Sequence, residues 1–370
     1  MKRSYSESHK GFTLIEVIIV IAIVGILGGM GIGYYFNYLQ QTTIKSAGDK
    51  IGAFLYSTQQ KSIGQEASSQ WGVHFENPTG ATGSFFASFK GSSYTTPEEK
   101  IFLEGYDYQF PADGTSVDVS FNKITGKVAG GTVKKVIVQL PAGGAAKTIR
   151  VMPTGSISVS DGEVGWWRLN DGTGTSARDI SPYQWSGTLS SGATFVASGC
   201  KEGGTGCVDF SGSGGYIDGG TRMDLDLPNQ MTAAAWIKPD SVTGTYAVVS
   251  RGNSDSTSNF WLDIRSSNQI FFGGYTAAGA GTYVSGTYTF TPGTWYHVAG
   301  VDDGTNLKIY VNGKQVASGA RATRISGNFP MRIGMRAGSG SYFDGQIDDV
   351  HIYDRGLNAD EISRLYERTK

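Results

Sequence analysis

The stretch Gly11-Phe-Thr-Leu-Ile-Glu16, together with the uncharged run behind it, decides how the first part of this 370-residue chain folds. Residues 17–44 include no charged side chain, and residues 17–27 are continuously apolar. About 20 such residues cross the hydrocarbon core of a bilayer as a helix, so we expect a membrane-spanning helix here. Three basic side chains in residues 1–10 predict that this leader stays in the cytoplasm and that the rest of the chain lies outside.

Glu16 is the unusual residue of this stretch, because it places a carboxylate in an otherwise apolar helix. A charge in lipid costs about 2.5–3.5 kcal/mol on insertion scales, which indicates a functional residue with a partner. A general secretory signal would be cut at an Ala-x-Ala type site, and no clear site of that kind follows the apolar run. The motif Gly11-Phe-Thr-Leu-Ile-Glu-Val17 resembles the type IV prepilin signature. The resemblance implies that a prepilin peptidase cuts after Gly11 and methylates Phe12, and that Glu16 pairs with the Phe12 amine of a neighbouring pilin subunit.

The same resemblance implies a single-pass inner-membrane protein, with its C-terminus outside, that later joins an extracellular or periplasmic filament. The residues favour neither a type IV pilus nor a type II secretion pseudopilus. Apolar residues at helical spacing predict that the helix, residues 12–63, leaves lipid and packs on its own domain. They are Tyr38, Leu39, Ile44, Ile51, Phe54 and Leu55. The glycines between Gly28 and Gly33 predict either a bent segment or close helix packing.

Residues 64–158 contain short β-like runs separated by turn signals such as Asn77-Pro78 and Asp113-Gly114. The predicted strands are 71–75, 83–89, 116–121, 133–140 and 147–151. Their order resembles GspH/FimT-type minor pilins and pseudopilins, which implies a small antiparallel β pilin domain. Residues 159–162, at the end of a Ser- and Gly-rich segment, are the predicted linker. The predicted fold class is α+β, with a long N-terminal hydrophobic helix, this small β domain and an all-β sandwich after it.

Residues 163–370 carry many strand-like runs with glycine turns between them, which favours a sandwich. The 54 glycines, 12% aromatic residues and 17% charged residues of the chain agree with turn-dense β structure. Blocks such as Gly293-Thr-Trp-Tyr-His-Val-Ala-Gly300 resemble the LamG-like jelly roll of the concanavalin A-like superfamily. At the end of the chain, Asn358-Ala-Asp-Glu361 predicts a capping box, with Leu357 and Ile362 at the two staple positions of a short helix.

The concanavalin A-like superfamily includes glucanases, so hydrolysis needs a test against the residues. Glycoside hydrolysis uses two carboxylates about 5–10 Å apart. By the resemblance, a glucanase of this superfamily would carry its carboxylates on one strand as Glu-x-Asp-x-(x)-Glu. No such run occurs in this sequence. Of the histidines, His9 lies in the leader, whereas His74, His297 and His351 lie in strand-like blocks, where a structural role is more common. We therefore predict no enzyme activity and no catalytic residue.

A nucleic-acid partner is not expected either, although some FimT-like minor pilins take up DNA. Phosphate contact needs clustered cations. The net charge of −1 gives no basic field. The best arginine cluster stands among acidic and neutral residues, which indicates a solvated surface. It consists of Arg321, Arg324, Arg332 and Arg336.

Two further features concern the sandwich. Cys200 and Cys207 lie outside the membrane, where disulfides persist, and we expect them to bond; the alternative is two separate thiols. Related sandwiches commonly bind calcium at loops, and hard cations prefer carboxylate and carbonyl oxygens. We therefore consider a structural Ca²⁺ at Asp179 and at Asp348 or Asp349, although Asp348 could equally hold a turn by hydrogen bonds.

LamG-like domains are generally recognition modules, and a sugar site needs exposed aromatic faces beside polar groups. Trp166, Trp236 and Trp295 lie in apolar strand blocks and are predicted to be buried. Other aromatic residues lie in loop-like segments and are the predicted ligand-binding residues. They are Tyr183, Trp185, Tyr275, Tyr283 and Tyr342.

The sequence thus predicts a filament subunit whose outer domain adheres to a glycan or a surface protein. Two alternatives remain: a type II secretion pseudopilin with a purely structural outer domain, and a DNA-uptake minor pilin.

Overall fold

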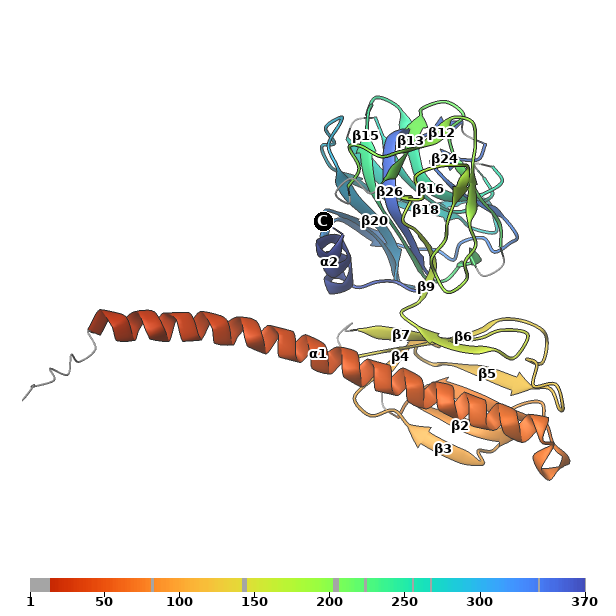
Figure 1. The fold of residues 1–370 in the computed structure, drawn as a ribbon. Helices are drawn as coiled ribbons and strands as arrows, with labels where there is room; N and C mark the ends of the chain where they lie inside the picture. Colours follow the sequence, from red (N-terminus) through yellow and green to blue (C-terminus); the bar gives the residue numbers. More distant parts are fainter. Residues whose placement is uncertain are drawn as a thin grey trace, which may run out of the picture.

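The computed structural model describes residues 14–80, 83–141, 145–201, 206–222, 225–254, 256–266, 268–338 and 340–369. Helix α1 (Leu14–Ile63) is one continuous helix, and its first half projects beyond the folded parts of the chain (Figure 1). The side chains of residues 20–34, 36 and 37, which hold most of the predicted membrane span, lie outside the described set. Among the described residues, no helix is long and apolar enough to cross a membrane.

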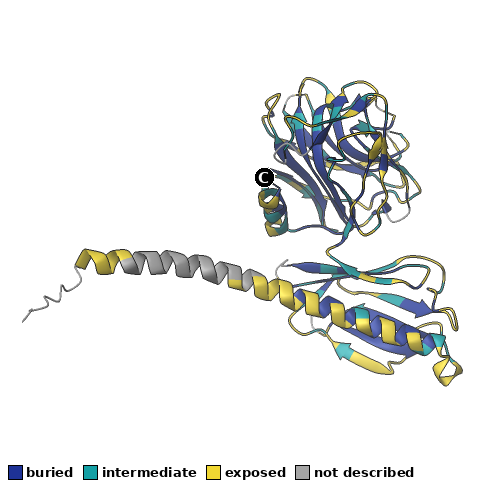
Figure 2. Cartoon of the chain, in the orientation of Figure 1, coloured by how far each residue is buried: buried dark blue, intermediate teal, exposed yellow. Residues whose placement is uncertain are grey.

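The second half of α1 packs on its own domain through one stripe of apolar side chains. Ile44, Ala47, Ile51 and Leu55 are buried there, and Figure 2 shows the opposite side of the helix exposed. Contrary to the sequence prediction, Tyr38 and Leu39 do not continue the stripe, since 67% and 39% of their surfaces are exposed. The helix makes its first buried contact with the domain only at Ile44.

The helix carries two small sheets, with the short η1 (Glu66–Ser68) at its end. One sheet runs in the order β3 (Glu99–Phe102), β2 (Phe85–Lys90), β1 (Trp71–Asn77) and β5 (Thr115–Phe121). The other runs in the order β4 (Asp107–Phe110), β6 (Lys134–Gln139), β7 (Ala146–Val151) and β8 (Ile157–Ser160). Side chains of both sheets form one core with α1, including Val73, Phe75, Val136 and Ile149.

Strand β8 corrects the prediction of a linker. Residues 157–160 pair with β7, so at most Asp161 and Gly162 connect this sheet to the next strand. Ile157 and Val159 pack against the core of the small β domain. The serines between them concealed an alternation of apolar and polar residues that is typical of a strand.

The rest of the chain forms a sandwich of two larger sheets. The first has the order β10 (Ser176–Ala177), β11 (Gly187–Leu189), β14 (Ile217–Thr221), β23 (Pro330–Ile333), β16 (Thr245–Gly252), β17 (Ser258–Arg265), β18 (Gln269–Tyr275) and β19 (Gly281–Thr287). The second has the order β12 (Ala193–Val196), β13 (Cys207–Ser211), β26 (Asp344–Tyr353), β15 (Met231–Pro239), β20 (Tyr296–Asp302), β21 (Asn306–Val311) and β22 (Lys314–Ala320), and β9 (Glu163–Trp167) also pairs with β26. A short pair, β24 (Met335–Arg336) and β25 (Ser341–Tyr342), lies beside β16.

The core of the sandwich lies between its two sheets, where Figure 2 shows the buried residues concentrated. Phe210, Phe260, Phe272 and Trp167 are among the large side chains that fill it. The described chain is therefore mostly β structure with few helices, and its main domain is a jelly-roll-like sandwich.

Helix α2 (Ala359–Arg368) covers the second sheet from outside, as the sequence predicts. Asn358 and Glu361 form the capping box, in which the Asn358 side chain accepts from the Glu361 N–H and the Glu361 carboxylate accepts from the Asn358 N–H. Leu357 and Ile362 are both buried in the contact between the helix and the sheet. This helix closes one face of the sandwich, and within the described residues no helix covers the outer face of the other sheet (Figure 1).

A buried ion pair joins the small β domain to the sandwich. Nε of Arg150, on β7, donates to Oδ2 of Asp354, directly after β26, at 2.6 Å, and both side chains are almost fully buried. Thr148 donates to the other oxygen of Asp354 at 3.2 Å, and Nζ of Lys135 donates to its backbone carbonyl at 2.7 Å. Both domains thus contribute charged groups to a single desolvated contact.

Candidate functional site

An open groove on the outer face of the first large sheet gathers aromatic and charged side chains. Successive residues of β17 face opposite sides of the sheet, so Phe260, Leu262 and Ile264 enter the core. The residues that alternate with them lie on the outer face: Trp261, Asp263 and Arg265. This alternation explains why two charged residues occur in a buried central strand.

A row of three residues across neighbouring strands gives the groove its shape. Gly273 of β18 lies opposite Trp261 of β17 on one side and opposite Tyr283 of β19 on the other. A Cβ atom on Gly273 would lie 2.4 Å from the Cβ of Tyr283 and 2.2 Å from the carbonyl oxygen of Thr282. Because only glycine fits there, the middle strand leaves a depression between two aromatic residues.

Tyr275 and Tyr283, both predicted as ligand-binding residues, line this groove together. The Tyr275 ring lies 5.1 Å from the Trp261 ring at a tilt of 44°, and Tyr283 is 55% exposed. The cavity volume is about 690 Å³. Its lining consists of Thr245, Trp261, Arg265, Tyr275, Tyr283, Arg336, Gly340 and Ser341.

One carboxylate beneath the groove binds two arginines. Oδ2 of Asp263 accepts from Nη2 of Arg265 and from Nη1 of Arg336, each at 3.1 Å. Burial raises the pKa of Asp263, and the two arginine charges oppose that rise. The guanidinium of Arg336 also lies over the Trp261 ring, 3.9 Å from its centre, in a cation–π contact. Among the described lining residues, these arginines are the charged ones.

The base of the groove has unused hydrogen-bonding capacity. The indole N–H of Trp261 and Oδ1 of Asp263 are both buried, and neither has a hydrogen-bond partner within the described part of the chain. Buried polar atoms without partners are uncommon in folded proteins, and each one needs a water molecule, a ligand or another explanation. Two such atoms on adjacent outward positions of β17 mark this face as a candidate binding site.

The other predicted ligand residues lie elsewhere. The hydroxyl of Tyr183 accepts from Nη1 of Arg150 at 3.0 Å, so Tyr183 lies at the junction with the small β domain. Trp185 is 50% exposed, away from the groove lining. Tyr342 lies in β25, next to a lining residue but not among the lining residues. The structure therefore brings together two of the five aromatic residues that the sequence singled out.

The predicted burial of three tryptophans holds for one of them. Trp236 is buried, whereas Trp166 and Trp295 are half-buried. The indole N–H of Trp166 donates to Asp349 at 2.6 Å, and that of Trp295 donates to the carbonyl of Gly199 at 2.9 Å. Both are held by polar contacts that an apolar sequence context does not reveal.

The carboxylates predicted to hold calcium are engaged within the protein. Both oxygens of Asp179 accept hydrogen bonds from backbone N–H groups. Asp348 accepts from the backbone N–H groups of Lys201 and Asp349, and Asp349 also accepts from the indole of Trp166. Within the described ranges, no group of three or more His, Cys, Asp or Glu residues could hold a metal ion. This donor set does not fit a calcium site.

The histidines of the strands are packed in structural positions. Nδ1 of His351 lies 2.7 Å from Glu163, and its Nε2 lies 3.1 Å from Asp349. Burial alone would lower the pKa of His351, but these two carboxylates raise it to about 9. Burial lowers the pKa of His297 to about 3. Neither these histidines nor His74 lines the groove.

Of the residues predicted for processing, assembly and cross-linking, the structure describes only some. Gly11 and Phe12 lie outside the described residues. Glu16 lies in the first turn of α1 with an exposed side chain. Cys200 and Cys207 form the disulfide that the sequence predicts.

Sequence reasoning missed Trp261, Arg265 and Gly273. The available signal was the alternation of polar and apolar residues along 258–265, followed by two glycines directly before Tyr275. Reading both segments as neighbouring strands would have placed these residues on one face.

The four arginines considered for nucleic acid are bound within the protein, and two of them, Arg321 and Arg324, share the buried carboxylate of Asp302. Arg324 is fully buried against Asp302 at 3.0 Å, and Arg336 belongs to the groove. Nη1 of Arg332 donates to the carbonyl of Gly252 at 3.3 Å. These residues do not form one cationic surface.

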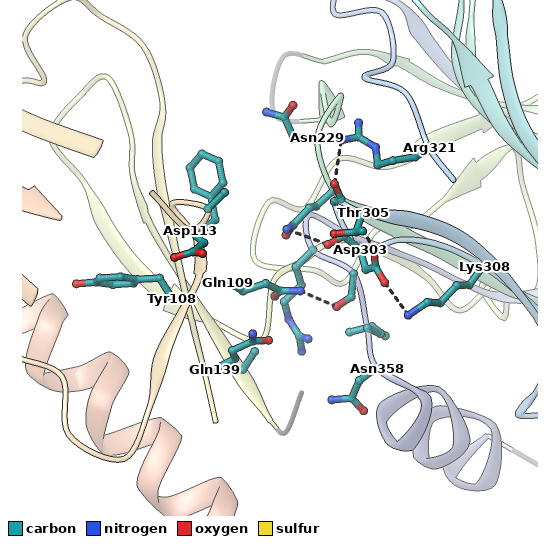
Figure 3. Close-up of a pocket in the computed structure, with 18 of the residues that line it drawn as sticks. Tyr108, Gln109, Asp113, Gln139, Asn229, Asp303, Thr305, Lys308, Arg321 and Asn358 are labelled. Atoms are coloured by element: carbon teal, nitrogen blue, oxygen red, sulfur yellow. Dashed lines mark hydrogen bonds and ion pairs between the residues drawn. The ribbon is translucent and has the colours of Figure 1, made fainter. Parts of the chain in front are cut away.

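A second cavity, of about 630 Å³, lies between the small β domain and the sandwich (Figure 3). Gln109 reaches across it and donates to the carbonyl of Gly356 at 3.3 Å. Lys308 and Asp303 pair within its wall at 2.6 Å. These polar groups already bind each other, so the cavity belongs to the contact between the domains. The groove on the first large sheet is therefore the better candidate for a ligand site.

Comparisons with known proteins match both ends of the chain. The model of the Concanavalin A-like lectin/glucanases superfamily matches residues 211–363, and that of the prokaryotic N-terminal methylation motif matches residues 8–32. A solved structure of the botulinum neurotoxin serotype G binding domain is similar with 18% identity and a TM-score of 0.46, over 56% of this chain and 51% of that one.

Two curated relatives match different segments. Adhesion G-protein coupled receptor V1 of Danio rerio is 28% identical over 182 residues, which is 45% of this chain but 3% of the receptor. A fimbrial protein of Pseudomonas aeruginosa is 43% identical over 47 residues, 13% of this chain and 30% of the fimbrial protein. This chain thus spans only a small part of the length of either relative. The chain thus matches a prokaryotic N-terminal methylation motif near its start, and it is similar to the concanavalin A-like superfamily over residues 211–363.

Proposed function

We propose that this protein is a subunit of a type IV pilin-like filament and that its sandwich binds carbohydrate in the groove beside Tyr275 and Tyr283. The observation that carries the proposal is the row Trp261–Gly273–Tyr283, which sets a glycine depression between two aromatic residues. The apolar face of a sugar ring packs on aromatic side chains, while its hydroxyls need polar partners. The groove offers both, with buried polar atoms at its base.

The filament part of the proposal rests on the N-terminal motif and on the fimbrial relative. A prepilin peptidase cleaves after Gly11, and the protein stays in the inner membrane through the apolar run until assembly. Glu16 then pairs with the Phe12 amine of a neighbouring subunit in the fibre core. The small β domain serves as a GspH/FimT-like collar, and the sandwich faces outward to adhere to glycans. Many weak sites on one filament bind strongly together.

We propose binding without hydrolysis. A glycosidase needs two carboxylates on either side of the bond, one of them free to act as an acid. In the groove, Asp263 lies beneath the lining and is held by Arg265 and Arg336. The charged residues of the described lining are arginines, which suit recognition of a ligand and not proton transfer at neutral pH.

A glycan array probed with the full-length protein in detergent tests the proposal, with affinities of positive glycans measured by calorimetry. Tyr283→Ala should weaken binding by about 10-fold, since one aromatic contact contributes roughly 0.5–1.5 kcal/mol beyond its buried area. Trp185→Ala is the matched control, because Trp185 is similarly exposed but lies outside the groove. An equal loss in both variants, or no glycan binding by the intact protein, would refute the assignment.

A further inference from the structure

We propose that the cavity between the small β domain and the sandwich binds a neutral saccharide that contacts both domains at once. This site is separate from the groove on the first large sheet, so the inference does not depend on the proposed function. Figure 3 shows Gln109 and Gln139 on the side of the small β domain, and Asp303 and Lys308 on the side of the sandwich. The inference rests on Gln109, on Gln230 and on the pairing of the charged groups around them.

Two glutamines of the cavity wall each have a buried oxygen that is available to accept a hydrogen bond. Gln109, on β4 of the small β domain, donates from its amide nitrogen to the carbonyl of Gly356 at 3.3 Å. Gln230, directly before β15 of the sandwich, donates in the same way to the carbonyl of Asp303 at 3.2 Å. The Oε1 atoms of both side chains are buried, and neither has a hydrogen-bond partner among the residues that the structure describes. A buried acceptor without a donor is unfavourable, so both oxygens need a donor in the cavity.

The charged groups of the lining are paired within the protein, which favours a ligand without charge. Each cation of the described lining forms an ion pair with a carboxylate. The pairs are Lys308–Asp303 at 2.6 Å, Arg355–Glu361 at 2.8 Å and Arg321–Asp302 at 3.1 Å. The remaining charged residue of the described lining, Asp113, is exposed and accepts from the backbone N–H of Gly80. A charged ligand would compete with these pairs, whereas a neutral ligand leaves them intact.

The uncharged part of the lining matches the hydroxyl groups of a sugar. It is rich in carboxamides, namely Gln109, Gln139, Asn229, Gln230 and Asn358. A carboxamide both donates and accepts hydrogen bonds, and so does a hydroxyl. The cavity volume of about 630 Å³ lies within the range of about 300–1,000 Å³ that is usual for small-molecule sites. Because each domain contributes one buried acceptor, a saccharide that donates to both oxygens links the two domains.

Calorimetry on the full-length chain tests the inference, in a detergent without a sugar headgroup, because a glycoside detergent would itself compete for the cavity. The chain carries Tyr283→Ala, which weakens binding in the groove, so that the remaining binding reports on the cavity. The probes are maltotriose, cellotriose and galactotriose, with trigalacturonate as the acidic analogue. We expect at least one neutral trisaccharide to bind, and the acid to bind no more tightly than galactotriose. Tighter binding of the acid would overturn the assignment to a neutral ligand.

Gln109→Met and Gln230→Met each remove one acceptor and keep the length of the side chain. Each should weaken binding by about 5-fold, which is typical for the loss of one neutral hydrogen bond. Gln109→Glu loses the same amide donor as Gln109→Met but keeps an acceptor, so it should bind more tightly than the methionine variant. This comparison separates the lost acceptor from any disturbance of the contact with Gly356. Gln60→Met, at an exposed glutamine of α1, should leave the affinity unchanged.

Three outcomes would overturn the inference. Binding that is unchanged in both methionine variants would place the saccharide outside the cavity and leave the proposed function of the groove intact. A loss in only one of these variants would show that the ligand does not link the domains. If no trisaccharide binds to the folded Tyr283→Ala chain, water satisfies the two oxygens and the cavity is not a ligand site.

Discussion

Asp354→Asn is the most informative change for the architecture, because it removes one charge from the contact between the two domains. In the native protein, Asp354 accepts from Arg150 and Thr148, and its carbonyl accepts from Lys135. Burial alone would raise the pKa of Asp354, but the charges of Arg150 and Lys135 hold it below its usual value. Asparagine keeps the size of the side chain and leaves both cations without their counter-ion.

The expected cost follows from the burial of the pair. Unit charges 4 Å apart attract by about 4 kcal/mol at an effective dielectric constant of about 20. Removing one partner of a buried pair typically costs about 3–5 kcal/mol, since the other charge stays desolvated. We expect a loss of that size in the free energy of unfolding. Because the folded pKa of Asp354 lies below its unfolded value of about 3.9, the contribution is full above that pH and is lost as pH falls.

Urea unfolding of the full-length protein in detergent measures the effect. With a slope of about 3 kcal/mol per M, the midpoint should fall by about 1 M or more. Asp161→Asn is the control at the same junction: its partner is Lys147, but the Asp161 side chain is 64% exposed, so we expect less than about 1 kcal/mol. Equal small shifts in both variants would show that the buried pair does not hold the domains together.

Four further predictions concern single features. The folded pKa of His351, about 9, lies above its unfolded value of 6.5, so the stability that protonated His351 contributes is full below pH 6.5 and declines toward pH 9. His351→Gln should therefore make the melting temperature less dependent on pH between 6.5 and 9. Reducing the Cys200–Cys207 disulfide should cost roughly 2–3 kcal/mol because the loop is short, and an unchanged melting temperature would contradict that. EDTA should leave the melting temperature unchanged, because Asp179 is already hydrogen-bonded; a drop together with copurified calcium would restore the metal site. Intact-mass analysis of the mature protein should give a methylated Phe12 at the N-terminus, and an unprocessed leader would contradict the pilin assignment.

Much of the fold follows from local patterns in the sequence. The end of α1 at Ile63 and the capping box at Asn358 depend on residues close in sequence, so pattern reasoning finds them. The predicted strands of the small β domain overlap β1, β2, β5, β6 and β7. The sequence analysis did not predict strand β3, which has charged residues, or strand β8, which is rich in serine. Their polar side chains are typical of loops.

The groove could be predicted only in part, because it depends on which strands are neighbours. Tyr275 and Tyr283 stand out as aromatic residues near glycines in the sequence, but Trp261 looks like an ordinary core residue. Its outward position follows from the alternation of β17 and from its register with Gly273. Pairing partners are set by long-range packing, which one sequence does not reveal. The same holds for Asp263, whose two arginine partners come from its own strand and from β24.

The buried contact between the domains bears directly on how a filament would use the groove. Arg150 lies on a sheet that packs against α1, and Asp354 directly follows the central strand β26 of the sandwich. Turning the sandwich relative to α1 would separate this pair and leave desolvated charges without their partners, which is costly. If α1 takes a regular place in a fibre, every groove then faces the surroundings at the same angle. Weak sites act together only when the geometry lets them engage at once. In the proposed adhesion, the ion pair would therefore matter although it lies outside the groove.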